Sequence, residues 1–308
     1  MKNSYKLVLL IAIIASLLFA DDEAGGVAGA YLRMPADART AALGNAGTVV
    51  LNDVNMTNGN PATIPSIRDK QFSSSFQFLS LDRSYQTIAL GVAMPPKAGM
   101  SITWIHAGVD NVIGRNSSND YTYEYNWSQN AFIIGFGLNI TEWLSIGLSG
   151  KVLNDQLVNS SSSGFSADVG LLVTPLKNLN LGFVLKDVSG KTTWDTSLEP
   201  YVEYQTRQVD HFPVSYHFGI SYLLADRVLF TGSYKYSEII EPTWHIGIEG
   251  KIGEAVFLRA GAENGAPTFG FGTSYKLWNN ITTRMDYAFL TGTIQQGGSH
   301  LFTWMFYF

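Results

Sequence analysis

The chain contains no cysteine among its 308 residues. This absence excludes disulfide bonds, thiolate metal sites, cysteine nucleophiles and attachment of a lipid to an N-terminal cysteine. Charged residues make up only 15% of the sequence, against about 25% in an average globular protein. The net charge of −5 gives no basic footprint for nucleic acid, so we expect no nucleic-acid partner.

Apolar runs long enough for a membrane-spanning helix are also missing. The first 20 residues combine Lys2 and Lys6 with an apolar run from Leu7 to Phe19, which ends before an acidic stretch. That run is shorter than the roughly 20 residues that a spanning helix needs. The pattern predicts a secretory signal peptide at 1–20, cleaved after Ala20, with a single membrane anchor as the alternative. We therefore expect an exported protein without a transmembrane helix.

From residue 71 onward, apolar and small polar residues alternate with a period of two. For example, Ile146 and Leu148 alternate with Ser145, Gly147 and Ser149, as in a strand with two different faces. Alternation and turn residues together predict 14 strands. They are expected at 71–80, 84–94, 98–109, 130–140, 143–154, 163–174, 178–188, 211–223, 227–237, 242–252, 255–263, 266–277, 280–290 and 299–308.

The lengths of these strands favour a membrane barrel. Most span 9 to 13 residues, whereas soluble strands have about 5 or 6 and a tilted strand crosses a bilayer with about 9 to 11. Short turns also alternate with longer polar loops at 110–129, 155–162, 189–210 and 291–298. We expect an all-β fold, a 14-stranded antiparallel transmembrane β-barrel at 71–308. A soluble sandwich or propeller, the alternative, requires an apolar interior and a charged exterior.

Residues 21–70 do not follow the strand pattern and predict either a periplasmic extension or a plug in the lumen. Four short stretches here resemble the N-terminal signature of the PorV/PorQ family, which is similar to the FadL-like superfamily of outer-membrane transporters. The matching stretches are Ala38–Arg39, Ala42–Gly47, Asn52–Asp53 and Asn60–Ala62. Asn45 replaces the usual Gly, and Thr63–Ile64 replaces the usual Gly-Leu.

The resemblance implies a 14-stranded barrel with an N-terminal hatch segment, here 21–70, inside the lumen. Its hatch motif maps onto Asp53, Asn60, Pro61 and Ala62. We expect Asn60 to bond locally to the backbone and Pro61 to fix the turn before the first strand. An ordinary Asn-Pro turn without a ligand role is the alternative.

Charged residues on the predicted lumenal face gather on the later strands. Both signs occur, so we expect internal ion pairs that fix the strands and the plug. Contact with a polar head group of a substrate is the second interpretation. These lumen-lining charges are Lys235, Glu249, Lys251, Arg259, Glu263, Arg284 and Asp286.

Nothing in the sequence indicates an enzyme. The five His residues lack the spacing of metal ligands, and Ser215 and His217 share a face without a recognisable third partner. We therefore expect no catalytic residue, no metal and no cofactor.

The chain ends in SHLFTWMFYF, which predicts a last strand that closes the barrel against the first one. Its alternate residues Phe302, Trp304, Phe306 and Phe308 would face lipid. A terminal aromatic residue on such a strand resembles the signal read by the barrel assembly machinery, and we assign that signal to Trp304, Phe306 and Phe308.

Two functions are consistent with these patterns. The superfamily resemblance implies a passive outer-membrane channel for hydrophobic or amphipathic small molecules. The PorV/PorQ resemblance implies an accessory barrel in type IX secretion, which docks secreted protein cargo. Outer-membrane lipid and the assembly machinery are expected partners in both cases.

Overall fold

The computed structural model describes residues 27–115, 118–157, 160–195, 207–278, 281–291 and 298–308. The predicted signal peptide lies outside these residues. Within them, no helix is both long and apolar enough to span a membrane. Four short helices come first: η1 (Ala30–Arg33), α2 (Ala38–Ala42), η2 (Val54–Asn58) and η3 (Pro61–Ser66). The strands are β1 (Gln71–Phe78), β2 (Arg83–Met94), β3 (Ala98–Arg115), β4 (Tyr121–Asn139), β5 (Leu144–Leu157), β6 (Ser160–Leu176), β7 (Leu179–Asp195), β8 (Arg207–His211), β9 (Ser215–Leu224), β10 (Val228–Ser237), β11 (Thr243–Ile252), β12 (Val256–Glu263), β13 (Ala266–Trp278), β14 (Ile281–Leu290) and β15 (Ser299–Tyr307).

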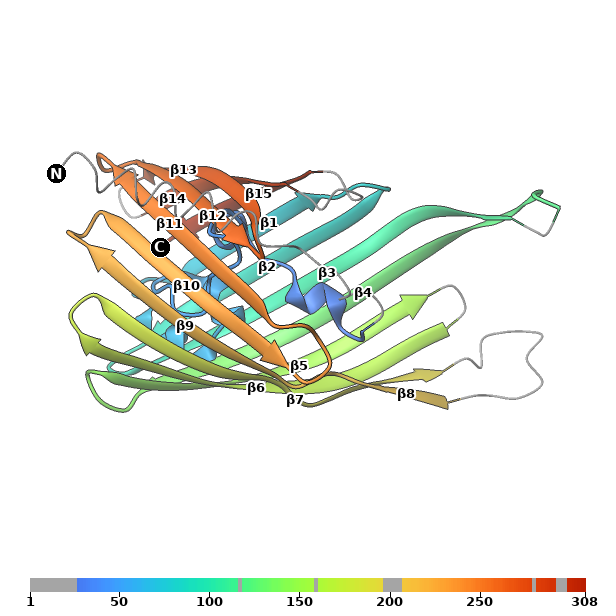
Figure 1. The fold of residues 1–308 in the computed structure, drawn as a ribbon, viewed down its shortest axis with the longest axis horizontal. Coiled ribbons are helices and arrows are strands. Elements are labelled where there is room, and N and C mark those ends of the chain that lie inside the picture. Colours follow the sequence, from blue (N-terminus) through green and yellow to red (C-terminus); the bar gives the residue numbers. More distant parts are fainter. Residues whose placement is uncertain (1–26, 116–117, 158–159, 196–206, 279–280, 292–297) are drawn as a thin grey trace.

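The strands form one closed antiparallel barrel (Figure 1). Strands β8 and β9 both pair with β7, one after the other, and so occupy a single position in the wall. The fifteen strands therefore fill 14 positions, and the predicted 14-stranded barrel is confirmed. Closure joins β1 to β15 from Gln71↔Tyr307 to Phe78↔His300.

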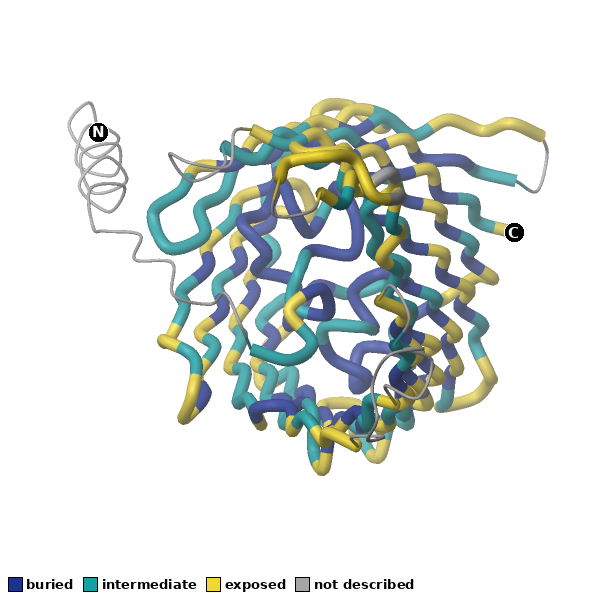
Figure 2. The backbone as a smooth tube through the Cα atoms, turned by 90° about the vertical axis from the view of Figure 1, so that its right-hand side faces the viewer, coloured by how far each residue is buried: buried dark blue, intermediate teal, exposed yellow. Residues whose placement is uncertain are grey.

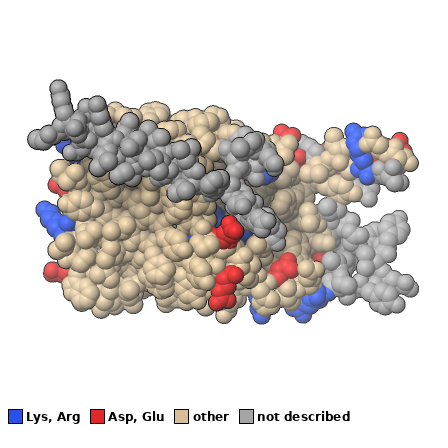
Figure 3. Space-filling model, in the orientation of Figure 1, with Lys and Arg blue, Asp and Glu red and all other residues tan. Residues whose placement is uncertain are grey.

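The two faces of the wall differ as the alternation predicts. On β1, Phe72, Phe76 and Phe78 point outward, whereas Gln71 and Ser73 are buried on the inner side. Figure 3 shows the result as a broad surface without charge on the left of the view, with Lys, Arg, Asp and Glu side chains at its left end and from the middle of the view to the right. An apolar exterior around a polar interior is the arrangement of a membrane barrel rather than of a soluble one.

The two rims of the barrel also differ. We call the end where β1 begins and β15 finishes the terminal rim, and the opposite end the loop rim. On the loop-rim side, β3 pairs with β2 only as far as Val109, and β4 pairs with β5 only as far as Trp127. Beyond these points β3 and β4 pair with each other alone, for example at Ile113↔Glu124, and project past the barrel (Figure 1).

The strands near the loop rim are longer than expected, which corrects the loops that the sequence predicted at 110–129, 155–162 and 189–210. Most of these residues lie in β3 to β8, and only 116–117, 158–159 and 196–206 fall outside the described residues. The composition was misleading because a strand beyond the bilayer needs no apolar face when its backbone bonds are satisfied by a neighbour. The strand expected at 211–223 is likewise divided, with β8 ending at His211 and β9 starting at Ser215.

Residues 27–70, which we call the inner segment, lie inside the barrel (Figure 2). Helix η3 contacts β2, β3, β4, β5 and β6, and α2 contacts β12 to β15 on the opposite side. Apolar residues of the segment, including Leu43, Val49, Val54 and Ile64, are fully buried. The inner segment thus occupies much of the interior of the barrel.

Candidate functional site

A polar side chain caps the N-terminus of three of the four helices in the inner segment. Asp37 accepts a hydrogen bond from the backbone N–H of Thr40 (2.5 Å), and Asp53 accepts one from the N–H of Asn55 (3.1 Å). Asn60 does the same for Ala62 (2.9 Å) ahead of η3, whose first residue is Pro61. Such caps satisfy backbone donors that a helix start leaves free. They allow a segment of small residues to hold a fixed shape.

A closed ring of alternating charges connects the inner segment to the wall. Two members come from the inner segment and four from β11, β12 and β14, and each side chain is at most 11% exposed. Going round the ring, the members are Arg39, Asp53, Arg284, Asp286, Arg259 and Glu249, which again contacts Arg39. We call this set the ion-pair ring.

The contacts in the ring are short. Asp53 Oδ2 lies 2.6 Å from Arg284 Nη2 and 3.2 Å from Arg39 Nη1. Arg39 also reaches Glu249 through two nitrogens, at 2.7 and 2.8 Å. Arg259 joins Glu249 (2.6 Å) to Asp286 (2.8 Å). Three positive and three negative groups compensate one another, so the ring carries no net charge.

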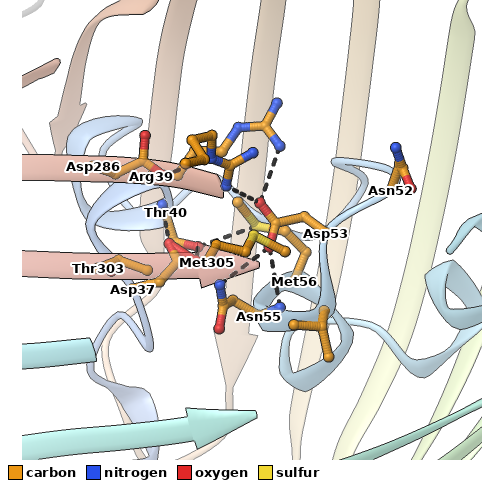
Figure 4. Close-up of polar contacts among 12 residues, drawn as sticks. Asp37, Arg39, Thr40, Asn52, Asp53, Asn55, Met56, Asp286, Thr303 and Met305 are labelled. Carbon is orange, nitrogen blue, oxygen red and sulfur yellow. Dashed lines mark hydrogen bonds and ion pairs between the residues drawn. The ribbon is translucent and has the colours of Figure 1, made fainter. Parts of the chain in front are cut away.

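Asp53 belongs both to the ion-pair ring and to the start of helix η2 (Figure 4). Burial alone would raise the pKa of its carboxyl group, but Arg284 and Arg39 outweigh that effect and hold the pKa below its usual range. The same carboxylate caps η2. Removing one member of a buried ion pair costs about 3–5 kcal/mol because the other charge stays buried. The ring therefore fixes the position of the inner segment.

Glycines on the inner face of the wall make room for the inner segment. Gly99, Gly137, Gly147 and Gly170 are direct neighbours on four consecutive strands. A Cβ atom at Gly147 would overlap the backbone of Pro61 and Ala62, and one at Gly99 would come within 2.9 Å of Ile64. On the other side, Gly247 and Gly261 face each other and leave space for Leu43 and Gly44. The segment thus lies directly against the backbone of the wall.

A cavity of about 400 Å³ lies between the inner segment and the loop rim. Its wall combines apolar side chains, such as Leu32, Met34 and Leu290, with polar ones from β7, β9 and β10. Residues of the loop rim, including Leu79 and Glu241, border its outer end. A largely apolar space with a few convergent polar groups is the usual form of a small-molecule site.

The wall is interrupted beside this cavity. Strand β7 pairs with β9 up to Lys186 and with β8 from Lys191 onward. In between, Asp187 and Ser189 have positive φ angles of 60° and 55°. Phe212 turns inward here, and its N–H donates to the carbonyl oxygen of Gly190 at 2.9 Å. Phe212 is buried and packs with Tyr31 of the inner segment.

The lumen-lining charges predicted from the sequence fall into two groups. Glu249, Arg259, Arg284 and Asp286 belong to the ion-pair ring, together with Asp53 of the hatch motif. The other three lie elsewhere. Lys235 and Glu263 line the cavity, and Lys251 lies near the terminal rim, where it contacts Glu254 in the adjoining turn (2.8 Å).

The remaining predicted residues lie at the two ends of the folded chain. Asn60 also donates from its amide to the carbonyl oxygen of Leu171 on β6 (3.3 Å), which links the hatch motif to the wall. At the end of the chain, Trp304 and Phe308 are 44% and 51% exposed on the outer face. Phe306 shares that face by the alternation of β15. The assembly role of these aromatic residues stays a prediction.

Sequence reasoning missed several residues of the interior. Lys151 forms ion pairs with Asp168 (2.8 Å) and Asp187 (2.7 Å), in a second buried cluster on β5 to β7. The alternation places Lys151 and Asp168 on the inner face and could have identified them. Arg39 belonged to the recognised signature, but its bridging role depends on how the inner segment turns inside the barrel.

Comparison with known proteins supports the fold. Neither a family model nor a curated protein sequence matches the chain. Among solved structures, the toluene transporter TodX of Pseudomonas putida has a TM-score of 0.62 at 13% identity, covering 89% of this chain and 96% of that one. The toluene transporter TbuX of Ralstonia pickettii has a TM-score of 0.63 at 11% sequence identity. The match covers 88% of this chain and 98% of that one.

A Pseudomonas aeruginosa FadL homologue gives a TM-score of 0.57 at 12% identity, covering 87% of this chain and 97% of that one. These structures match nearly the whole barrel but share few residues with it. The chain has the fold of the FadL-like transporters.

Proposed function

We propose that the protein is an outer-membrane channel for the passive passage of hydrophobic or amphipathic small molecules. The observation that carries this proposal is the cavity of about 400 Å³ inside a barrel with an apolar exterior. In this proposal the terminal rim faces the periplasm, from which the chain arrives, and the loop rim faces outward. The inner segment acts as the hatch beneath the cavity.

Known barrels of this fold support the proposal. TodX and TbuX are described as toluene transporters, and the further match CymD as a monoaromatic hydrocarbon channel. A passive channel needs no catalytic group, and we propose no enzymatic role. The docking role in type IX secretion draws no support from these matches.

The proposed channel can be tested by a substitution that narrows the cavity and leaves the strand pairing of the wall unchanged. Ala266 lines the cavity at the start of β13, so Ala266→Trp would fill its outer part. Cells that carry the variant should take up N-phenyl-1-naphthylamine several-fold more slowly than cells with the unaltered protein. Ala260→Trp, on the outer face of β12, serves as the matched control and should leave uptake unchanged.

Both variants are first checked for recovery in the outer-membrane fraction and for a heat-dependent shift on gels, which reports a folded barrel. The channel would be contradicted if cells with the unaltered protein, cells with Ala266→Trp and cells that lack the protein took up the dye at the same rate. Recovery of the protein in another cell fraction would contradict the proposed location.

A further inference from the structure

The terminal rim of the barrel carries more basic than acidic residues in its turns and at its strand ends. The basic residues are Arg68, Lys70, Lys97, Lys177, Arg227, Lys251 and Lys276, and the acidic ones are Asp69, Glu142, Asp226 and Glu254. Among these residues, all of which the structure describes, one ion pair is formed, between Lys251 and Glu254 (2.8 Å). The rest of the terminal rim therefore has an excess of positive charge.

The loop rim has the opposite balance. Its basic residues are Arg83, Arg115, Lys191 and Arg207, and its acidic ones are Asp82, Asp110, Asp120, Glu124, Asp195, Asp210, Glu238, Glu241 and Glu263. The whole chain has a net charge of −5. The positive charge of the terminal rim is thus a local property and does not follow from the overall composition.

The basic residues of the terminal rim lie next to the edge of the apolar exterior. An exposed apolar side chain stands at the end of the strand just before the turn in each of three cases. These pairs are Met94 with Lys97, Leu176 with Lys177 and Leu224 with Arg227. A long basic side chain in such a place can lay its aliphatic stem on the apolar surface and hold its charge at the level of lipid headgroups.

Other features of this rim agree with a position at the membrane interface. Trp143 and Trp278 are 54% and 67% exposed at the ends of neighbouring strands, and exposed Trp side chains are typical of the interface. The basic residues also lie around the barrel rather than in one patch. Lys97 lies between β2 and β3, Lys177 between β6 and β7, and Lys276 near the end of β13. This distribution fits a surrounding layer of lipid better than one soluble ligand.

We propose that the terminal rim binds the headgroups of anionic phospholipids, with phosphatidylglycerol as the representative. The negative charge of such a leaflet attracts basic residues held at its surface. In the orientation given above, this leaflet is the periplasmic one. The inference requires an apolar barrel wall with a basic edge, and it does not depend on what passes through the cavity.

The test uses native mass spectrometry of the full-length protein in a nonionic detergent, with equal amounts of dioleoyl phosphatidylglycerol and dioleoyl phosphatidylcholine. The two lipids share their acyl chains and differ in the charge of the headgroup. We expect the unaltered protein to bind phosphatidylglycerol at least about fivefold more tightly, the factor that one basic residue near an anionic surface supplies. Combining Lys97→Gln, Lys177→Gln and Arg227→Gln should lower this ratio to below about twofold.

The matched control combines Arg115→Gln, Lys191→Gln and Arg207→Gln, which removes the same number of charges at the loop rim and should keep the preference. All variants are checked for the heat-dependent gel shift, and single substitutions of Lys97 and Lys177 replace the triple variant if it fails to fold. An equal affinity of the unaltered protein for both lipids would overturn the proposal. An undiminished preference in the terminal-rim variant, or an equal loss in the loop-rim control, would do the same.

Inorganic phosphate tests whether the rim binds a lipid or a soluble anion. Added in excess, it should leave phosphatidylglycerol bound, because the acyl chains also hold the lipid against the apolar wall. Release of the lipid by phosphate would assign the terminal rim to soluble anions and overturn the lipid assignment.

Discussion

At the scale of single residues, Asp37 is an acidic side chain beside the ion-pair ring that has no ion pair of its own in the described structure. Its carboxyl group is fully buried and accepts hydrogen bonds from the N–H and hydroxyl of Thr40. Burial and the nearby charge of Asp53 raise its pKa from 3.8 to about 7. Between these two values the folded protein holds a proton that the unfolded chain has released.

This proton makes the docking of the inner segment depend on pH. Because the folded state binds the extra proton, the free energy of unfolding falls as pH rises from about 4 to about 7. Asp37→Asn keeps a capping oxygen but cannot ionise. We expect the variant to protect the amides of residues 38–43 at least about tenfold better than the unaltered protein at pH 8, the factor for one pKa unit.

Hydrogen exchange followed by mass spectrometry, corrected for the intrinsic pH dependence, measures this difference. At pH 4 the two proteins should exchange alike, which serves as the internal control. Equal protection at pH 8 would show that Asp37 is charged without cost in the folded protein.

At the scale of elements, the inner segment fits against the wall because glycines on the inner face of the wall carry no side chain. A Cβ atom at Gly147 would overlap the backbone between Pro61 and Ala62, which have no flexible end that could move away. Gly250 on β11, by contrast, has nothing within 4 Å of the position of a Cβ atom. The two glycines therefore form a matched pair.

We expect Gly147→Val to displace η3 while the barrel still closes, because the wall pairs independently of the segment. Overpacking of this kind costs about 1–3 kcal/mol, or more where backbone must move. Limited proteolysis should cut the variant between residues 54 and 70 much faster than the unaltered protein, with the heat-dependent gel shift retained. Gly250→Val should resist cleavage like the unaltered protein, and equal resistance of Gly147→Val would refute the fit.

The elements of the barrel were largely predictable from the sequence. A period of two is a local property, and outward residues such as Ile146 and Leu148 alternate with inward ones whatever the neighbouring strands are. Strand ends were less predictable, because polar composition does not distinguish a loop from a ribbon that pairs outside the bilayer. The extension of β3 to Arg115 illustrates this point.

The interior was predictable only in part. The inward charges of β11, β12 and β14 followed from alternation, but their partners depend on the path of the inner segment, which has no periodicity. The glycine neighbours Gly137 and Gly147 are visible in the sequence as inward glycines, yet only the register aligns them. The polar wall of the cavity likewise combines residues of β7, β9 and β10, whose relative stagger the sequence leaves open.

At the scale of the whole molecule, the barrel closes by pairing its first strand with its last. The last pair in this ladder is Gln71↔Tyr307, and the N–H of Phe308 donates to the carbonyl oxygen of Lys70 (2.9 Å). Phe308 thus lies just beyond the ladder, at the terminal rim, and the residue is 51% exposed. Its removal would leave the closure of the wall intact.

We therefore expect deletion of Phe308 to lower the amount of inserted barrel several-fold without changing the stability of the barrels that form. Quantitative immunoblots of outer-membrane fractions measure the amount, and the temperature of the gel shift measures stability. Phe308→Tyr keeps a terminal aromatic ring and should insert normally. Insertion of the deleted chain at the normal level would exclude a role for Phe308 in assembly.

The ion-pair ring also bears on the order in which the chain is completed. Arg39 and Asp53 lie in the first fifth of the sequence, whereas Glu249, Arg259, Arg284 and Asp286 lie in its last third. A chain that stops before β14 leaves Asp53 without Arg284, and one that stops before β11 also leaves Arg39 without Glu249. The charged residues of the inner segment thus obtain their full set of partners only from the last strands of the barrel. A chain that lacks these strands leaves buried charges of the inner segment without a partner.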